Sequence, residues 1–213
     1  MIYAFVASIL RDEFVPKRGT GKTLSLTYYL YLKHLEGKRV ITNYFTPFSD
    51  MMNITDIILG ILDGTITNAE IGLTEFQHVL DNLGHKQLKK RIWRLVVSQS
   101  RKLGLNFYLD LQILRQADND ARDHVDYILI PRKYHVDGSY CRKDDCPVKN
   151  HRIMIYTNIH PYGEIAIKCL KAENVGKLYD TTKITIDPIN LYKLKKYSEL
   201  FGDIKIPKEV KDS

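Results

Sequence analysis

The residues whose types and spacing suggest chemistry most clearly stand between positions 17 and 23, directly before a long segment without helix breakers. Two glycines let the backbone close around phosphate oxygens, Lys22 has the length to reach the outer phosphates, and the Thr23 hydroxyl can ligate magnesium. The pattern predicts a loop that binds ATP and Mg²⁺, formed by Lys17, Arg18, Gly19, Thr20, Gly21, Lys22 and Thr23. The alternative is a glycine turn that caps a helix beside an unrelated lysine.

The start of this loop departs from the usual pattern. Pro16 stands where a first glycine is expected, five residues before Gly21, and its fixed backbone angle cannot copy a glycine. The apolar run Ile2 to Ala7 is the convincing candidate for the strand that leads into the loop, which makes residues 7–16 an insertion that could weaken nucleotide binding. In the other interpretation the short piece Phe14-Val15 is that strand, and the amino-terminal run packs elsewhere.

A candidate catalytic acid follows a short buried strand predicted at Ile71 to Leu73. An enzyme that hydrolyses ATP needs a carboxylate at the end of a neighbouring strand to orient the attacking water, and usually a second one near the metal. Glu75 is placed to be the water-orienting base. Thr74 occupies the position where aspartate is usual, so magnesium would depend more on Thr23, water and the phosphates. Alternatively, Glu75 is only the first-turn acid of a helix.

A second group of residues with possible chemistry lies within 17 residues: His135, Cys141, Cys146 and His151. Two thiolates and two imidazoles suit a tetrahedral Zn²⁺ site. The gap between the cysteines falls within the range of zinc turns, but the histidine spacings match no common module. A zinc site, a disulfide in a hyperthermophilic host and free thiols all remain open. The third cysteine, Cys169, falls in a predicted strand and is expected in the core.

Composition limits the class of protein. The chain has 213 residues, of which 44% are apolar and 27% charged, with three cysteines and a formal net charge of +7. These values suit one domain in a reducing, intracellular compartment and exclude global disorder and a disulfide scaffold. The apolar runs are far shorter than the roughly 20 residues of a membrane-spanning helix, and the amino end lacks a secretory signal. The positive charge weakly favours nucleic acid as a partner.

Helix-like and strand-like segments alternate up to about residue 130, and this alternation predicts an α/β fold with a mostly parallel central sheet flanked by helices. The expected strands are Ile2 to Ala7, Arg39 to Phe45, Ile71 to Leu73, Leu105 to Leu111 and Tyr127 to Pro131. The expected helices are Lys22 to Leu35, Asn53 to Asp63, Gln87 to Arg101 and Asp118 to Val125. We expect a protruding loop at 132–151, an antiparallel extension made by Arg152 to Thr157 and Glu164 to Leu170, one ATPase domain over 1–187, and a basic tail over 188–213 with a helix at Leu191 to Leu200.

The order of these motifs resembles the FtsK/HerA superfamily of DNA-pumping P-loop ATPases, and more closely the genome-packaging ATPases of archaeal viruses. The resemblance covers roughly residues 17–183 and rests on the phosphate loop, on LTEFQ at 73–77, on the run SQSRKLG at 98–104 before a strand that ends in glutamine, and on LYDT at 178–181. It implies that Gln112 senses the γ-phosphate. It also implies that Arg101 is an arginine finger offered to a neighbouring subunit, with Arg94 and Arg122 as competitors. Without the resemblance, Gln112 is a polar strand end and Arg101 a solvated charge.

The function that this resemblance implies is an ATP-hydrolysing translocase that packages double-stranded DNA into a viral capsid. It would work as a ring, in the host cytoplasm or on the virion, beside a capsid or portal-like component and without a membrane partner. Basic residues in 86–102 and in the loop 132–152 would face DNA phosphates. One alternative is a Zot-like ATPase of virion assembly or export, although such proteins usually add a membrane-spanning segment. The other is a catalytically degenerate P-loop protein that binds DNA, suggested by Pro16 and Thr74.

Overall fold

The computed structural model describes residues 1–8, 20–76, 86–113, 122–143, 146–147, 151–159, 164–171, 175–179 and 193. Within these residues one eight-stranded sheet has the order β3-β2-β4-β5-β1-β6-β7-β8. Its strands are β1 (Ile2–Ser8), β2 (Arg39–Thr42), β3 (Asp50–Met51), β4 (Ala69–Leu73), β5 (Asn106–Ile113), β6 (Tyr127–Tyr134), β7 (Arg152–Ile159) and β8 (Glu164–Lys171). Every pairing from β3 to β6 is parallel, whereas β6, β7 and β8 form an antiparallel arm.

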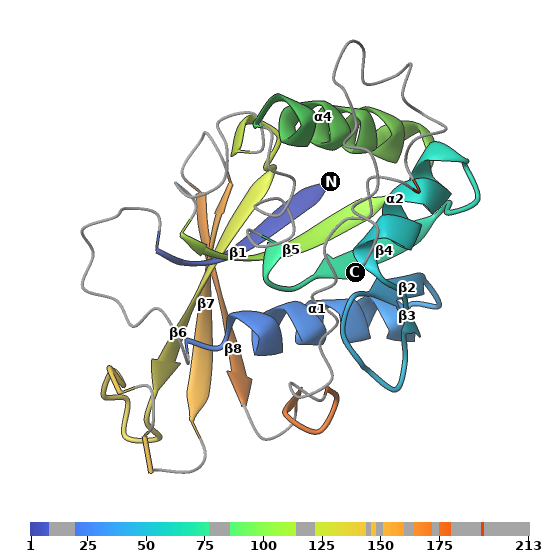
Figure 1. Ribbon diagram of the computed structural model, residues 1–213. Coiled ribbons are helices and arrows are strands. Elements are labelled where there is room, and N and C mark those ends of the chain that lie inside the picture. The colour runs from blue at the N-terminus through green and yellow to red at the C-terminus, as the bar shows by residue number, and fades with distance from the viewer. Residues whose placement is uncertain are drawn as a thin grey trace, which may run out of the picture.

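Helices cover both faces of the parallel part of the sheet (Figure 1). Helix α1 (Lys22–Leu35) lies on one face, and α2 (Ile54–Leu62) and α4 (Lys86–Lys102) lie on the other. The Asn53 side chain caps α2 by accepting a hydrogen bond from the Asp56 amide. A mostly parallel sheet between two helical layers, with antiparallel strands toward the carboxyl end, confirms the predicted α/β fold.

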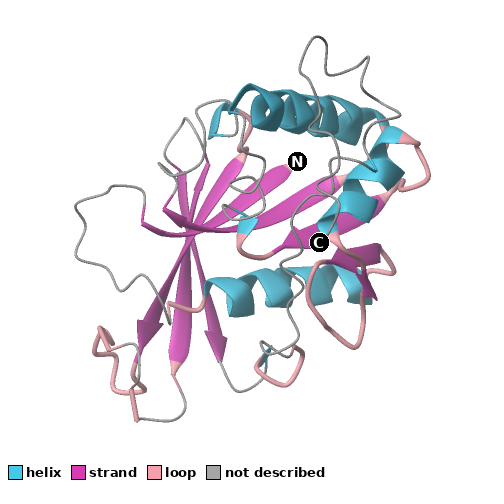
Figure 2. Cartoon of the chain, viewed as in Figure 1, coloured by secondary structure: helices cyan, strands magenta, loops and turns pink. Residues whose placement is uncertain are grey.

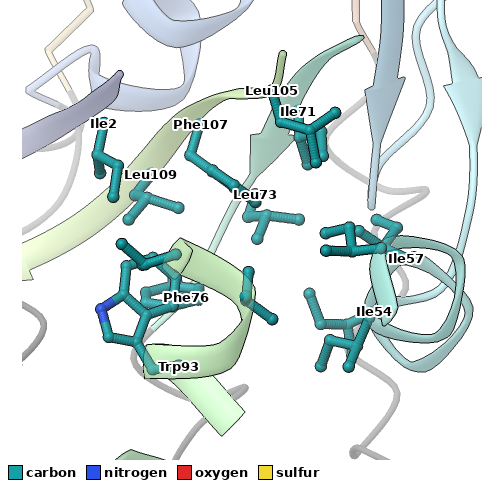
Figure 3. Close-up of a cluster of buried hydrophobic side chains, with 14 of the residues drawn as sticks. Ile2, Ile54, Ile57, Ile71, Leu73, Phe76, Trp93, Leu105, Phe107 and Leu109 are labelled. Carbon is teal, nitrogen blue, oxygen red and sulfur yellow. The ribbon is translucent and has the colours of Figure 1, made fainter. Parts of the chain in front are cut away.

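Two hydrophobic cores lie on opposite faces of the sheet because neighbouring side chains along a strand point to opposite faces. The core beneath α2 and α4 contains Trp93, Phe107 and Ile57, as Figure 3 shows. The core beneath α1 contains Leu26 and Leu30 of the helix together with strand residues from both parts of the sheet: Phe5, Tyr108, Ile153, Ile155 and Leu170. Helix α1 therefore packs on the parallel strands and on the antiparallel arm at once.

The sequence-based boundaries hold for α1 and differ elsewhere by a few residues. Strand β2 ends at Thr42 rather than at Phe45, and the short edge strand β3 was not predicted. The antiparallel strands are longer than expected, and Figure 2 shows them projecting past the helical layers. The predicted helix at Leu191 to Leu200, apart from Lys193, and the first half of the one at Asp118 to Val125 lie outside the described residues. Among the described helices, none has the length and apolar character needed to cross a membrane.

The prediction that Cys169 belongs to the core is wrong. Cys169 is exposed, while its neighbour Leu170 is 4% exposed and faces α1. The reason is that β8 is an edge strand, and no helix within the described residues covers its second face, where Ile167 is also exposed. An apolar strand pattern fixes which side chains share a face, but it does not say which face another layer covers.

Candidate functional site

The described part of the phosphate loop lies where α1 begins. Strand β1 sits in the middle of the sheet and runs parallel to both neighbours, which confirms Ile2 to Ala7 as a strand of the sheet. The alternative strand at Phe14-Val15 lies outside the described residues. Gly21 is the residue before α1 and has a left-handed backbone with φ of 90°. A glycine offers no side-chain cap, and the first turn of α1 has no acidic residue, so its amide groups are oriented toward any anion bound there. Pro16, Lys17, Arg18 and Gly19 lie outside the described residues.

The antiparallel arm contacts Gly21 of this loop and the end of β1. A Cβ added at Gly21 would lie 3.0 Å from Cδ1 of Ile153 on β7, so a larger residue would meet both backbone strain and a close side chain. Arg132 on β6 donates a hydrogen bond to the carbonyl oxygen of Ala7, near the end of β1. The arm therefore lies beside both the end of β1 and the residue before α1.

A carboxylate that the sequence analysis did not single out lies at the centre of the site. Asp110 is on β5, on the face that points toward α1. The Thr23 hydroxyl donates to its Oδ2 over 2.6 Å, and the Lys22 ammonium lies 3.8 Å from its Oδ1. The signal for it was present, because a carboxylate two positions before Gln112 interrupts the apolar pattern of a buried strand. The structure thus joins the two chemical residues of the loop to one acid.

Burial raises the pKa of Asp110 above its ordinary value of 3.8. The positive charge of Lys22 and the hydrogen bond from Thr23 act in the opposite direction, while the nearby carboxylate of Glu75 raises the pKa further. The net direction is upward, so Lys22 and Thr23 compensate the buried charge only in part. A divalent cation beside Thr23 would supply the missing positive charge, and hydroxyl, carboxylate and water oxygens are the ligands that Mg²⁺ prefers. The residues therefore fit a magnesium ion.

Glu75 follows β4 in a turn that holds it in an unusual backbone conformation. Its φ is 51°, which is uncommon for a residue other than glycine and costs roughly 1–3 kcal/mol. The adjacent Thr74 is held on both sides by the buried Asn43, whose Nδ2 donates to the Thr74 carbonyl over 3.1 Å and whose Oδ1 accepts from the Thr74 amide over 2.8 Å. The Thr74 hydroxyl also points to Asn43 Oδ1, at 3.4 Å. Asn43, missed by the sequence analysis, fixes the turn that directs Glu75 toward Asp110.

Replacing Asn43 by alanine should lower both stability and turnover. The change leaves two buried backbone groups of Thr74 without these partners, at about 1–3 kcal/mol for each group, and releases the turn that places Glu75. Urea unfolding and the steady-state rate of ATP hydrolysis measure the two effects. Asn53→Ala is the matched control, because it removes the α2 cap and should cost about 1 kcal/mol without changing kcat. A wild-type kcat in Asn43→Ala would contradict the positioning role.

Three tyrosine and threonine side chains support the site from behind. The hydroxyls of Thr27 on α1 and Tyr44 lie 2.9 Å apart, and Thr27 also donates to the Thr23 carbonyl. The rings of Tyr44 and Tyr179 pack edge to face, with centroids 6.5 Å apart. Burial raises the pKa of Tyr179, and the charge of Asp110 raises it further. The described part of LYDT, Leu178 and Tyr179, therefore lies beside the group formed by Tyr44, Thr27 and Asp110.

The other predicted site residues are Gln112 and three candidate arginines, and they lie on different elements. Gln112 is half-buried and, by strand alternation, shares the α1-facing side of β5 with Asp110. Arg101 is exposed at the end of α4. Burial lowers the pKa of the Met1 amino group, and the nearby positive charge of Arg101 lowers it further. Because Met1 precedes β1, Arg101 lies at the edge of the sheet opposite the phosphate loop. Arg94 is exposed on α4, and Arg122 is half-buried.

The four predicted zinc ligands are brought together at the end of the arm. The ligand atoms of His135, Cys141, Cys146 and His151 all lie within 4.8 Å of one another. Both cysteines are free thiols, so the structure does not contain the disulfide that the sequence left open. This cluster is separate from the acids described above and comes from the hairpin that joins β6 to β7.

The chain was compared with protein families, curated proteins and solved structures. No protein-family model matches the chain, and no curated protein matches it. Among solved structures, the chain is similar to a KaiC-like protein from the hyperthermophilic archaeon Pyrococcus horikoshii OT3, with 8% identity over 79% of this chain and 83% of that chain and a TM-score of 0.47. The functional proposal below therefore rests on the residues of this chain alone.

Proposed function

We propose that the chain is a magnesium-dependent ATPase. The observation that supports this most strongly is the contact of one buried carboxylate with both chemical residues of the phosphate loop: Asp110 accepts a hydrogen bond from Thr23 and lies near Lys22. This is the arrangement needed to hold a metal ion against phosphates, because the hydroxyl ligates the ion while the carboxylate orients its water ligands. The uncapped start of α1 adds the amide groups that a phosphate needs.

Asp110 also accounts for the absence of aspartate at position 74. Thr74 is buried, and its polar groups bond to Asn43. The metal-side carboxylate comes instead from β5, the next strand in the sheet. The proposed site therefore has two acids, Asp110 beside the loop and Glu75 after β4, and the electrostatic interaction between them supports a shared role.

In the proposed mechanism each residue has a separate task. Lys22 and the loop amides hold the outer phosphates and balance the charge that develops on the transferred group. Glu75 orients the attacking water and accepts its proton, and Gln112 contacts the γ-phosphate or that water. Asp110 keeps the Thr23 hydroxyl turned toward the metal position. Thr23 and Asp110 would hold Mg²⁺, which would neutralise part of the phosphate charge.

The test is ATP hydrolysis by the purified chain with Mg²⁺, with EDTA, and with or without double-stranded DNA. Lys22→Ala, which removes the loop ammonium, is measured beside the wild type to identify contaminating activity. Turnover that needs Mg²⁺ and Lys22 would support the proposal. A folded wild type that neither hydrolyses nor binds MgATP would instead support the degenerate P-loop protein.

We further propose that hydrolysis moves double-stranded DNA, in a ring of subunits that packages a viral genome. This finer assignment is supported by the order of phosphate loop, Glu75, basic helix and Gln112, and by exposed basic residues on α4: Arg91, Arg94, Arg101 and Lys102. DNA should raise the ATPase rate, and the stimulation should decline as salt increases, because contacts to phosphates release counterions. An ATPase rate that is independent of DNA would favour the Zot-like alternative.

Arg101→Ala should reduce turnover at least about tenfold without weakening nucleotide binding, if Arg101 completes the site of a neighbouring subunit. Its position at the edge opposite its own phosphate loop suits an action in trans. Mixing Arg101→Ala subunits with Glu75→Gln subunits should restore part of the activity, since some sites then combine an intact acid with an intact arginine. Arg94→Ala is the control on the same helix. Full activity of Arg101→Ala would exclude it as the finger.

A further inference from the structure

The end of the antiparallel arm holds a compact group of soft metal ligands. The four ligand atoms of His135, Cys141, Cys146 and His151 lie within 4.8 Å of one another, whereas ligands around a tetrahedral zinc ion are about 3–4 Å apart. Small side-chain rotations would thus bring all four onto one ion. The histidine rings are already neighbours, with centroids 5.0 Å apart.

Two ring nitrogens in this group lack a hydrogen-bond partner among the described residues. Nδ1 of His135 and Nε2 of His151 are buried, and neither makes a hydrogen bond within the part of the chain that the structure describes. A buried polar atom without a partner costs free energy, and such atoms in a folded protein usually mark an ion or water that completes them. Cys141 is also buried, at 3% exposure, with its sulfur 3.8 Å from the Lys143 carbonyl. The group is therefore enclosed rather than scattered over a surface loop.

The backbone holds three of the four ligands in place before any metal binds. His135 directly follows β6, and His151 directly precedes β7, where Tyr134 and Arg152 are paired. A tight turn then brings the chain back, with hydrogen bonds between His135 and Ser139 and between the Cys141 amide and the Lys133 carbonyl. Only Cys146 arrives from outside this ladder. A preorganised set of this kind loses little conformational freedom on binding.

We propose that His135, Cys141, Cys146 and His151 bind one Zn²⁺ ion that closes the end of the arm. Two thiolates and two imidazoles form a tetrahedral set suited to zinc, and they do not suit Mg²⁺ or Ca²⁺, which require oxygen ligands. Four protein ligands leave no open position, so the ion would be structural rather than catalytic. None of these four residues takes part in the proposed ATPase reaction.

The test is metal content and ligand mapping on the full chain, purified under reducing conditions and dialysed against Zn²⁺. We expect one zinc per chain by elemental analysis, and Co²⁺ substitution should give the visible absorption of a tetrahedral thiolate site. Cys141→Ala and His151→Ala should each lose the stoichiometric metal. Cys169→Ala and His124→Ala are matched controls at exposed positions, and both should keep it.

A measurement on the unmodified protein covers the case in which a variant does not fold. Cys146 should resist alkylation when zinc is bound and react after chelation, while the exposed Cys169 should react in both states. Two results would overturn the proposal: a wild type that binds no stoichiometric zinc or cobalt, or equal alkylation of Cys146 with and without metal.

Discussion

Asp110→Asn should abolish most magnesium-dependent ATP hydrolysis while leaving the fold at least as stable as the wild type. The carboxylate accepts the Thr23 hydroxyl over 2.6 Å and faces Lys22, so its charge organises the metal position. Asparagine has the same shape but lacks that charge. Loss of one such preorganised electrostatic contact typically costs 10²–10³-fold in kcat, and we expect about that reduction.

The effect on stability follows from the direction of the pKa shift. Burial raises the pKa of Asp110 above 3.8, so the folded state binds a proton more tightly than the unfolded state does. The contribution of this group to the free energy of unfolding is fully present below pH 3.8 and declines as pH rises through the folded pKa. Asparagine does not titrate, so the variant should gain in melting temperature relative to the wild type as pH increases from 4 to 7.

Asp126→Asn is the control for this experiment. Asp126 accepts a hydrogen bond from the Ile2 amide over 2.8 Å, at the edge of the sheet away from the phosphate loop. Its replacement should leave Mg²⁺-dependent turnover unchanged. Melting curves across the pH range and rates measured against Mg²⁺ concentration separate stability from catalysis. Wild-type turnover in Asp110→Asn would refute the metal-side role of this carboxylate.

Glu75→Gln should produce a protein that binds ATP but hydrolyses it about 10²–10⁴-fold more slowly. A positioned general base contributes an effect of that size, and glutamine keeps the length of the side chain while losing the ability to accept a proton. The Asn43 contacts to Thr74 do not depend on the carboxylate, so the turn should persist. Because the Glu75 charge raises the pKa of Asp110, the variant should also bring that pKa closer to its ordinary value.

Glu70→Gln tests whether loss of a different carboxylate, one within β4, also slows ATP hydrolysis. Glu70 is buried at the amino-terminal part of that strand, where it accepts hydrogen bonds from Tyr108 at 2.9 Å and Asn106 at 3.0 Å. We expect this variant to lose stability and to retain kcat. Single-turnover hydrolysis and titration with a fluorescent ATP analogue distinguish chemistry from binding. Equal rates for Glu75→Gln and the wild type would remove Glu75 from the mechanism.

Much of this fold could be predicted from the chain because its strongest patterns are local. The apolar run before Ser8 and the breaker-free segment of α1 follow from composition and periodicity, and the glycine-lysine-threonine sequence marks the turn between them. The motif also predicted Lys22 and Thr23 as neighbours of the same ligand, since both begin one helix. Local spacing was sufficient for the part of the site that one loop supplies.

Residues that depend on strand order were harder to predict. Asp110 is 87 positions from Thr23, and it reaches the loop only because β5 is inserted between β1 and β4 in the sheet. Asn43 and Thr74 are 31 positions apart and meet because β2 and β4 pair in parallel. A pattern along the chain does not encode such pairings. The exposed Cys169 was misassigned for the same reason, since burial depends on which layers cover a strand.

The contact between Gly21 and Ile153 gives the two candidate sites a shared boundary. Ile153 lies two residues after His151, and its side chain fills the space beside Gly21, the residue before α1. Thermodynamic reciprocity then applies: if a bound nucleotide alters the affinity of the hairpin for zinc, zinc must alter the affinity for nucleotide by the same factor. In that case, loss of zinc would change the affinity of the chain for ATP.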